Sequence, residues 1–233
     1  MWATNQSALV WMDYMSSNDR LIINELKKRL LEISYEHHLS HLCSCLNVLP
    51  TIYNIFKTKK EVDSFVLSNG HSALAYYVVL EHFYNVNAED ILQKHGIHPV
   101  RDIENNIEVS TGSLGLGLPI AVGYAMSSPN NNVYCIISDG ECSEGSIWEA
   151  LMFASRQKLS NLHVYCIVNG QSAYQDINYS KLIKQLRAFL PSIEIVYETS
   201  VISKEVKGLL AHYHAIKSEK ELKDLIDRNC TNA

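Results

Sequence analysis

Apolar residues form two kinds of pattern along the chain, and their order predicts an α/β protein. Two short runs, at 133–137 (VYCII) and 163–168 (HVYCIV), are almost continuously apolar, which is typical of strands buried on both faces of a parallel sheet. The segment between them, from about Ser146 to Gln157, has apolar residues at helical spacing and predicts a crossover helix. Residues 63–84 predict a further strand, turn and helix. We therefore expect an α/β fold with a mostly parallel sheet and helices on both faces.

The same patterns predict the elements nearer the two ends of the chain. Four more segments are assigned in this way: helices over 18–35, 177–189 and 218–228, and a strand over 193–197. Ser17 or Asn18 is placed to cap the first of these helices. Ser218, with Glu221 at the third helical position, is placed to cap the last.

Length and charge narrow the class of protein. At 233 residues the chain is long enough for one large α/β domain with a sizeable core. We expect this domain over residues 18–233, preceded by an N-terminal arm over residues 1–17. The net charge is −5 and there is no block of lysine or arginine. The charge pattern therefore gives no sign of a nucleic acid or membrane partner.

The cysteines and the N-terminal segment indicate the compartment. The six cysteines have neither CxxC nor zinc-like spacing, so we expect free thiols in a reducing environment. The N-terminal segment has no basic region and no long apolar stretch, and so resembles neither a signal peptide nor a membrane span. A cytoplasmic location is expected.

Two polar turns follow the two apolar runs. Asp139-Gly140 comes after the first run and Asn169-Gly170 after the second, thirty residues later. One strand–helix–strand crossover spans that distance and brings both side-chain oxygens to the carboxyl edge of the sheet. A carboxylate, an amide oxygen and a nearby backbone carbonyl suit a hard divalent cation, which also takes water and phosphate oxygens as ligands. The acidic turn alone is common, and the second turn makes the pattern more specific.

Several histidines are candidates for chemistry. His71 follows Asn-Gly at the expected start of a helix, where the positive partial charge lowers the histidine pKa and favours a neutral imidazole that exchanges protons. His37, His38 and His41 lie together before another helix. We interpret His37 and His38 as surface residues, and favour a functional role for His41 over the same surface interpretation.

A glycine-rich segment, TGSLGLG at 111–117, enters the next predicted helix. Glycines permit close backbone approach, and the following helix offers N–H groups to an anion. Tight helix packing is the alternative explanation for these glycines.

Taken in order, these motifs resemble those of the transketolase family, which binds thiamine diphosphate. The family's GHxGSxLS, SxGH, GxHP, TGxLGxG and GDG…NN motifs correspond here to residues 41–46, 68–71, 96–99, 111–117, and 138–140 with 169–170. The chain departs from the family at Ser138, which replaces the first glycine of GDG, and at Gly170, which replaces the second asparagine. Leu42-Cys43 replaces a residue-plus-glycine pair. After Gln171 about one βα unit of the family is missing, so the C-terminal tail is shortened.

The resemblance implies a thiamine-diphosphate-binding fold, in which residues 18–233 are the diphosphate-binding domain, and assigns roles to particular residues. Mg²⁺ or Ca²⁺ would be held with the diphosphate by Asp139, Asn169 and the Gln171 carbonyl. The cofactor would be bound by Gly112, Ser113, Leu114, Asp139, Gly140, Glu141 and Asn169. Catalytic roles would fall to four histidines: His71 and His98 at substrate oxygens, His41 in proton transfer, and His212 in the tail.

Two glutamates after the acidic turn, Glu144 and Glu149, match the family's EGxxxE pair. In the family these resemble an acidic network that links two cofactor sites across a dimer. They are also favoured at a helix N-terminus by the helix macrodipole, and both interpretations can hold together.

The resemblance covers the diphosphate-binding part of the family and implies a second polypeptide. A complete site also needs a pyrimidine-binding domain, so we expect a partner subunit that carries this domain, in an α2β2 heterotetramer. The implied function is transfer of a two-carbon ketol unit from a ketose to an aldehyde, with a specialised or nucleotide-linked sugar as one candidate substrate. Two alternatives are a thiamine-diphosphate synthase that decarboxylates a 2-oxo acid and a degenerate cofactor-binding subunit that only scaffolds a partner.

Overall fold

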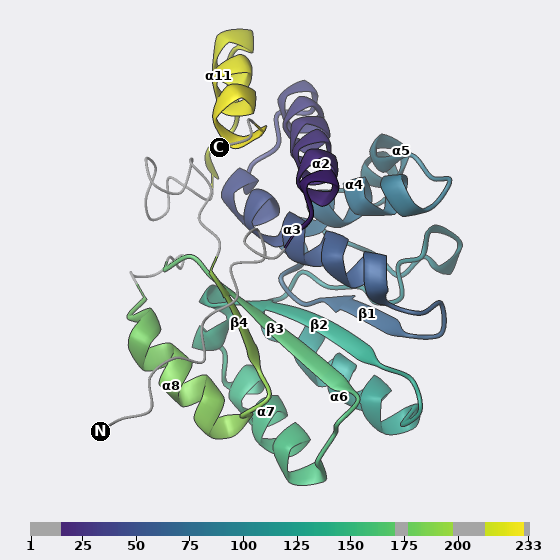
Figure 1. Ribbon diagram of the computed structural model, residues 1–233, viewed down its shortest axis with the longest axis vertical. Helices are drawn as coiled ribbons and strands as arrows, with labels where there is room; N and C mark the ends of the chain where they lie inside the picture. Colours follow the sequence, from purple (N-terminus) through teal and green to yellow (C-terminus); the bar gives the residue numbers. More distant parts are fainter. Residues whose placement is uncertain (1–14, 171–176, 198–212, 231–233) are drawn as a thin grey trace.

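The computed structural model describes residues 15–170, 177–197 and 213–230, and these residues are arranged around a parallel β-sheet (Figure 1). The sheet has four strands in the order β1-β2-β3-β4, and each neighbouring pair is parallel. The strands are β1 (Ser64–Leu67), β2 (Val133–Ser138), β3 (Leu162–Val168) and β4 (Glu194–Tyr197). The predicted α/β fold with a parallel sheet is confirmed.

Helices cover both faces of the sheet. One face carries α2 (Ser17–Glu36), α3 (Leu42–Thr58) and α4 (Ala73–Phe83), and the other carries α6 (Gly117–Ser127), α7 (Gly145–Gln157) and α8 (Tyr179–Phe189) (Figure 1). The second group lies on one face because the strands follow chain order and parallel crossovers are right-handed. The remaining helices are α5 (Ala88–His95) and α11 (Glu219–Cys230), with 3₁₀ turns η1 (Gly70–Ser72), η2 (Ile103–Asn105) and η3 (Gly140–Ser143).

Alternation along the central strands divides the core into two clusters. In β2, Ile136 faces the α2–α4 layer, whereas Cys135 and Ile137 face the α6–α8 layer. In β3, Tyr165 and Ile167 join the first cluster in the same way. Successive side chains of a strand point to opposite faces, so an unbroken apolar run is what a sheet covered on both sides requires.

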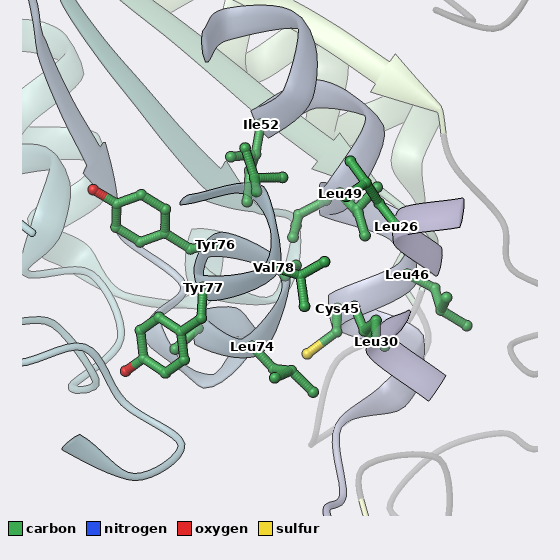
Figure 2. Packing of buried hydrophobic residues seen from close by; sticks show 14 of the residues in the cluster. Leu26, Leu30, Cys45, Leu46, Leu49, Ile52, Leu74, Tyr76, Tyr77 and Val78 are labelled. Carbon is green, nitrogen blue, oxygen red and sulfur yellow. The ribbon is translucent and has the colours of Figure 1, made fainter. Parts of the chain in front are cut away.

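The α4 helix is buried on nearly every side. Its residues from Ala73 to Leu80 are all buried, which is expected of a helix that is apolar around its whole circumference. Figure 2 shows its side chains against Leu26 and Leu30 of α2 and against Leu46, Leu49 and Ile52 of α3. At the end of the described chain, α11 packs against α2 (Figure 1).

The helix ends correct one prediction and confirm another. The cap of α2 is Ser16, not Ser17 or Asn18, because the Ser16 hydroxyl accepts a hydrogen bond from the Asp19 N–H at 3.2 Å. At α11 the Ser218 hydroxyl accepts from the Glu221 N–H at 3.2 Å, as predicted.

Two further observations concern the described residues, which do not include residues 1–14 of the predicted N-terminal arm. The six cysteines all lie in the described residues, and none forms a disulfide. Within the described ranges, no helix combines the length and the apolar character needed to cross a bilayer.

Candidate functional site

The candidate site lies at the carboxyl edge of β1, β2 and β3, where parallel α/β sheets bind ligands. Four segments meet there: the histidine turn after β1 (68–72), the glycine-rich loop (111–117), the acidic turn after β2 (138–141) and the Asn-Gly turn after β3 (169–170).

The acidic turn and the Asn-Gly turn are in direct contact. The Asp139 carboxylate accepts hydrogen bonds from the backbone N–H groups of Asn169 and Gly170, at 3.0 and 2.8 Å. It also accepts one from the Gly140 N–H at 2.9 Å. The expected juxtaposition of these two turns is therefore present. Gly170 has φ +80°, a left-handed conformation that glycine and asparagine adopt most readily, so glycine suits the backbone at this position.

Asp139 has the environment of a cation ligand. Only 3 % of the residue is exposed, and burial raises the pKa of its carboxyl to about 6, although the backbone hydrogen bonds act in the opposite direction. Among the described residues, the hydrogen bonds that this carboxylate accepts come from backbone N–H groups. A divalent cation beside the carboxylate would supply the positive charge that favours its ionised form, so Asp139 and its turn fit a metal ion.

The histidine turn and the glycine-rich loop touch through their backbones. A Cβ atom added to Gly70 would lie 2.7 Å from the backbone nitrogen of Gly112, which is closer than real side chains allow. Only glycine permits this approach, so the two loops meet backbone to backbone at Gly70 and Gly112. A Cβ atom on Gly112 would in turn lie 3.1 Å from the ring of His98, which places that histidine beside the same loop.

Two of the predicted histidines lie together. The ring centroids of His41 and His71 are 5.2 Å apart. His41 precedes α3 in a left-handed conformation, with φ +65°, and its Nδ1 lies 2.9 Å from the Ser40 hydroxyl. His71 directly follows Gly70, and His98 lies against Gly112, so both histidines are next to the contact of the two loops. His98 is exposed, whereas His41 and His71 are half-buried.

The neighbouring His37 belongs to a different surface. Its Nε2 lies 3.2 Å from a carboxylate oxygen of Glu89, which also pairs with Arg29 at 2.8 Å. This ion-pair group joins α2 to α5 and agrees with the interpretation of His37 as a surface residue.

The remaining predicted residues differ in exposure, and two of them are not described. In the glycine-rich loop, Ser113 is exposed and Leu114 half-buried. Glu141, which the resemblance assigns to the cofactor, has no exposed surface, so its side chain does not face a ligand in this structure. Of the EGxxxE pair, Glu144 packs against Gly115 and Glu149 is exposed on α7. Gln171 and His212 lie outside the described residues.

Sequence reasoning missed the side chains that fix the glycine-rich loop to β1. The Thr111 hydroxyl donates to the Leu67 carbonyl at 2.7 Å, and the Glu108 carboxylate accepts from the Phe65 N–H at 3.1 Å. Both bonds satisfy backbone groups at the edge of the sheet. The available signal was that both residues lie in or just before the glycine-rich motif and have side chains that form hydrogen bonds.

A second support lies under the segment that carries His98. The Asp102 carboxylate accepts hydrogen bonds from Lys94 at 2.7 Å and from Asn105 at 2.7 Å, and lies 2.8 Å from His95 Nε2. These partners, Lys94 first, hold the pKa of Asp102 well below its ordinary value. This cluster ties the end of α5 to the 96–111 segment itself.

Comparison with known proteins relates this chain to transketolases. The family model described as "Transketolase, thiamine diphosphate binding domain" matches residues 54–189. A Phocaeicola vulgatus protein, named as one subunit of an apulose-4-phosphate transketolase, is 40 % identical over 156 residues, which cover 58 % of this chain and 55 % of that protein. Human "Transketolase-like protein 2" is 33 % identical over 170 residues, covering 63 % of this chain and 26 % of that one. The chain thus spans about half, or less, of the length of these relatives.

Solved structures agree in fold. The transketolase from Leishmania mexicana superimposes with a TM-score of 0.65 at 19 % identity, covering 93 % of this chain and 45 % of that chain. A Pichia stipitis transketolase gives a TM-score of 0.66 at 17 % identity, with 92 % and 44 % covered.

Proposed function

Because the chain belongs to the family of transketolase thiamine diphosphate binding domains, we propose that it is the diphosphate-binding subunit of a two-polypeptide, transketolase-like transferase. The observation that carries this proposal is the contact of the Asp139 carboxylate with the Asn169-Gly170 turn at the carboxyl edge of the sheet. The transferred group is a two-carbon ketol unit, taken from a ketose and passed to an aldehyde.

The metal ion in this proposal is Mg²⁺ or Ca²⁺, held by Asp139, Asn169 and the backbone carbonyl of Gln171. The buried carboxylate with a raised pKa supports the assignment, since a cation would offset its desolvation. The ion would neutralise the cofactor's diphosphate and fix that end of the molecule in the site.

The cofactor is thiamine diphosphate, bound along Gly112, Ser113, Leu114 and Gly140. When bound, it supplies the electron sink that cleavage beside a ketose carbonyl requires. The tight contact of Gly70 with Gly112 supports a cofactor role, because it leaves backbone rather than side chains at the meeting point of the two loops.

Histidines perform the proton transfers and hold the sugar. His71 and His98, both next to that loop contact, contact substrate oxygens, and His41, 5.2 Å from His71, moves protons. His212 takes a fourth position from the tail. General acid–base catalysis of this kind contributes about 10²–10⁴-fold, so each histidine alone is expected to modulate the rate rather than abolish it.

The partner is a second polypeptide that carries the pyrimidine-binding domain, in an α2β2 assembly. Two relatives, 40 % and 36 % identical to this chain, are named as subunits of apulose-4-phosphate transketolases, which supports a second polypeptide. The surface next to the site supports it as well. Helix α6 contains no charged residue, yet Ile120, Gly123 and Met126 on its outer side are exposed. A helix without charge on its outer face is normally covered, and we assign the cover to the partner.

The substrate in this proposal is a specialised sugar rather than a general pentose phosphate, with a nucleotide-linked sugar as one candidate. The Phocaeicola vulgatus relative, named for apulose-4-phosphate, supports specialisation. The free cysteines support a reducing, cytoplasmic location.

The test is a calorimetric titration of thiamine diphosphate with Mg²⁺ into the co-purified pair of subunits. Wild type should bind, Asp139→Ala should lose binding, and Asp224→Ala, which removes an exposed carboxylate of α11, should bind like wild type. Normal binding by Asp139→Ala contradicts the metal assignment. Lack of binding by wild type indicates a scaffold subunit. In a separate turnover assay of the pair, consumption of pyruvate in place of a ketose indicates a 2-oxo acid synthase.

A further inference from the structure

Glu141 joins three segments of the site that are far apart in the chain. Its Oε1 accepts hydrogen bonds from the Ser68 hydroxyl at 2.7 Å and from the Gly115 N–H at 3.0 Å. Its Oε2 accepts from the Ser138 N–H at 3.0 Å, and its own N–H donates to the Ser138 hydroxyl at 3.3 Å. One carboxylate therefore connects the histidine turn, the glycine-rich loop and the acidic turn.

The carboxylate has no access to a ligand in the site. None of the residue's surface is exposed, so a ligand would meet the segments that Glu141 holds rather than Glu141 itself. Burial of a carboxylate is unfavourable unless hydrogen bonds compensate, and here both of its oxygens accept them. Hydrogen bonds to an ionised acceptor are about twice as strong as neutral ones, and a fully satisfied buried network makes its surroundings rigid.

Each group bonded to Glu141 lies close in sequence to a candidate site residue. Ser68 is in the turn that ends at His71, Gly115 directly follows Leu114, and Ser138 directly precedes Asp139. One side chain thus links the histidine turn, the glycine-rich loop and the turn that carries the candidate cation ligand.

We propose that Glu141 is a positioning residue that sets the relative placement of the histidine turn, the glycine-rich loop and the acidic turn, and that it does not touch the cofactor. A carboxylate suits this role because the three groups directed at it are all donors. A glutamine would turn an NH₂ group toward one of those donors, and an aspartate is one methylene too short to keep all three bonds. The loop contacts stand on the geometry alone, whereas the consequence for cofactor binding rests on the proposed function.

The first test is hydrogen exchange of the full chain without cofactor. In Glu141→Gln and Glu141→Ala, amides at 66–72 and 111–117 should exchange at least about tenfold faster, because each bond to the ionised carboxylate is worth more than a neutral one. Amides of α2 and α11 should not change. Ser143→Ala, on the exposed side of the same 3₁₀ turn, is the matched control and should exchange like wild type.

Three outcomes of this measurement overturn the proposal. They are unchanged exchange in both segments, faster exchange confined to 138–141, and equally faster exchange throughout the chain, which would mean that Glu141 is merely a core residue. If the Glu141 variants do not fold, Ser68→Ala removes a single donor and keeps the carboxylate. It should then accelerate exchange in 66–72 more than in 111–117, and equal exchange to wild type overturns the proposal.

The second test measures thiamine diphosphate binding and turnover by the co-purified pair. Glu141→Gln should weaken cofactor binding about tenfold or more, while kcat at saturating cofactor changes less than threefold, because the chemistry does not use the carboxylate. A loss of kcat that saturating cofactor does not restore makes Glu141 catalytic and overturns the positioning role. If wild type binds no cofactor, the proposed function fails, and the exchange measurement decides the role of Glu141 alone.

Discussion

Helices α4 and α6 are similar in sequence character but differ in how they are covered. Both are 11 residues long and strongly apolar, and each packs on one face of the sheet. Helix α4 is enclosed by α2 and α3, and its residues from Ala73 to Leu80 are buried (Figure 2). Helix α6 is covered by the sheet on its inner side, whereas Met126, on its outer side, is 50 % exposed.

The comparison shows that the apolar sequence of a helix does not tell whether the same chain or a partner covers its outer face. Helix α4 is covered by α2 and α3, which precede it in the same chain. Neighbouring α7 extends the exposed surface of α6 with Phe153, which lines the same hollow as Met126, so the apolar surface crosses two helices. It adjoins the candidate site, since Ser146 of α7 donates to the Gly115 carbonyl at 2.8 Å. A partner on this surface would therefore contact the elements that support the glycine-rich loop.

The largest expected effect compares truncations in the two helices. Leu80→Ala in α4 removes a fully buried side chain and should lower the free energy of unfolding by about 2–5 kcal/mol. Met126→Ala in α6 should change it by less than about 0.5 kcal/mol in the isolated chain. Urea unfolding of the two variants and wild type measures both values. Equal destabilisation would mean that Met126 is packed within this chain and that the α6 surface is not free.

The second effect concerns the partner. Met126→Glu and Phe153→Glu place charges on the exposed apolar surface, so they should leave the unfolding free energy of the isolated chain within about 0.5 kcal/mol of wild type. Each should weaken association with the partner by about a hundredfold, since burial of an unpaired charge at an interface is strongly unfavourable. Sedimentation of mixed subunits measures the association.

The matched control for these variants lies on the other layer. Leu21→Glu changes a residue of α2 that is also 50 % exposed but lies outside the α6–α7 surface, and it should leave association unchanged. If Leu21→Glu and Met126→Glu weaken association equally, or if neither does, the partner does not bind at α6.

The part of the fold that was predicted from sequence depends on local pattern. The β2–α7–β3 unit follows from two apolar runs and one helical period, because each signal lies within a single element. The cap of α2 was misplaced by one residue, since Ser16, Ser17 and Asn18 are all good caps and only the backbone geometry selects among them. Helix α5 was not assigned because its 8 residues are too few to show a clear helical pattern of apolar positions.

The site was predicted as far as its residues lie at strand ends or in recognisable motifs. The closeness of Asp139 to the Asn169-Gly170 turn followed from the two strand assignments and the crossover length, whereas the backbone hydrogen bonds between them did not. The role of Glu141 did not follow either, because its partner Ser68 lies 73 residues earlier in the chain and no local pattern links the two. Long-range hydrogen bonds of this kind require the three-dimensional arrangement.

The smallest expected effect tests the link that keeps the α4 cover in place. Asp19 of α2 accepts hydrogen bonds from Lys57 at 2.6 Å and from Tyr53 at 2.9 Å, and both donors belong to α3. Its hydrogen bond with Lys57, helped by Ser16, holds the pKa of Asp19 well below its ordinary value. Asp19→Asn keeps the shape but removes the charge, and should lower the unfolding free energy by about 1–2 kcal/mol at pH 7.

The lowered pKa of Asp19 also predicts how its contribution to the unfolding free energy changes with pH. A carboxyl group with a pKa that is lower in the folded state contributes stability at pH values above its unfolded pKa of about 3.9, and loses it as the pH falls toward the folded value. The difference between wild type and Asp19→Asn should therefore be constant from pH 7 to about pH 5 and shrink below pH 4. Asp224→Asn, at an exposed pair with Arg228 on α11, should change stability by less than about 0.5 kcal/mol throughout. A difference for Asp19→Asn that does not change with pH would show that its charge does not join α2 to α3. The cover of α4 would then rest on apolar packing and on the Arg29–Glu81 pair between α2 and α4.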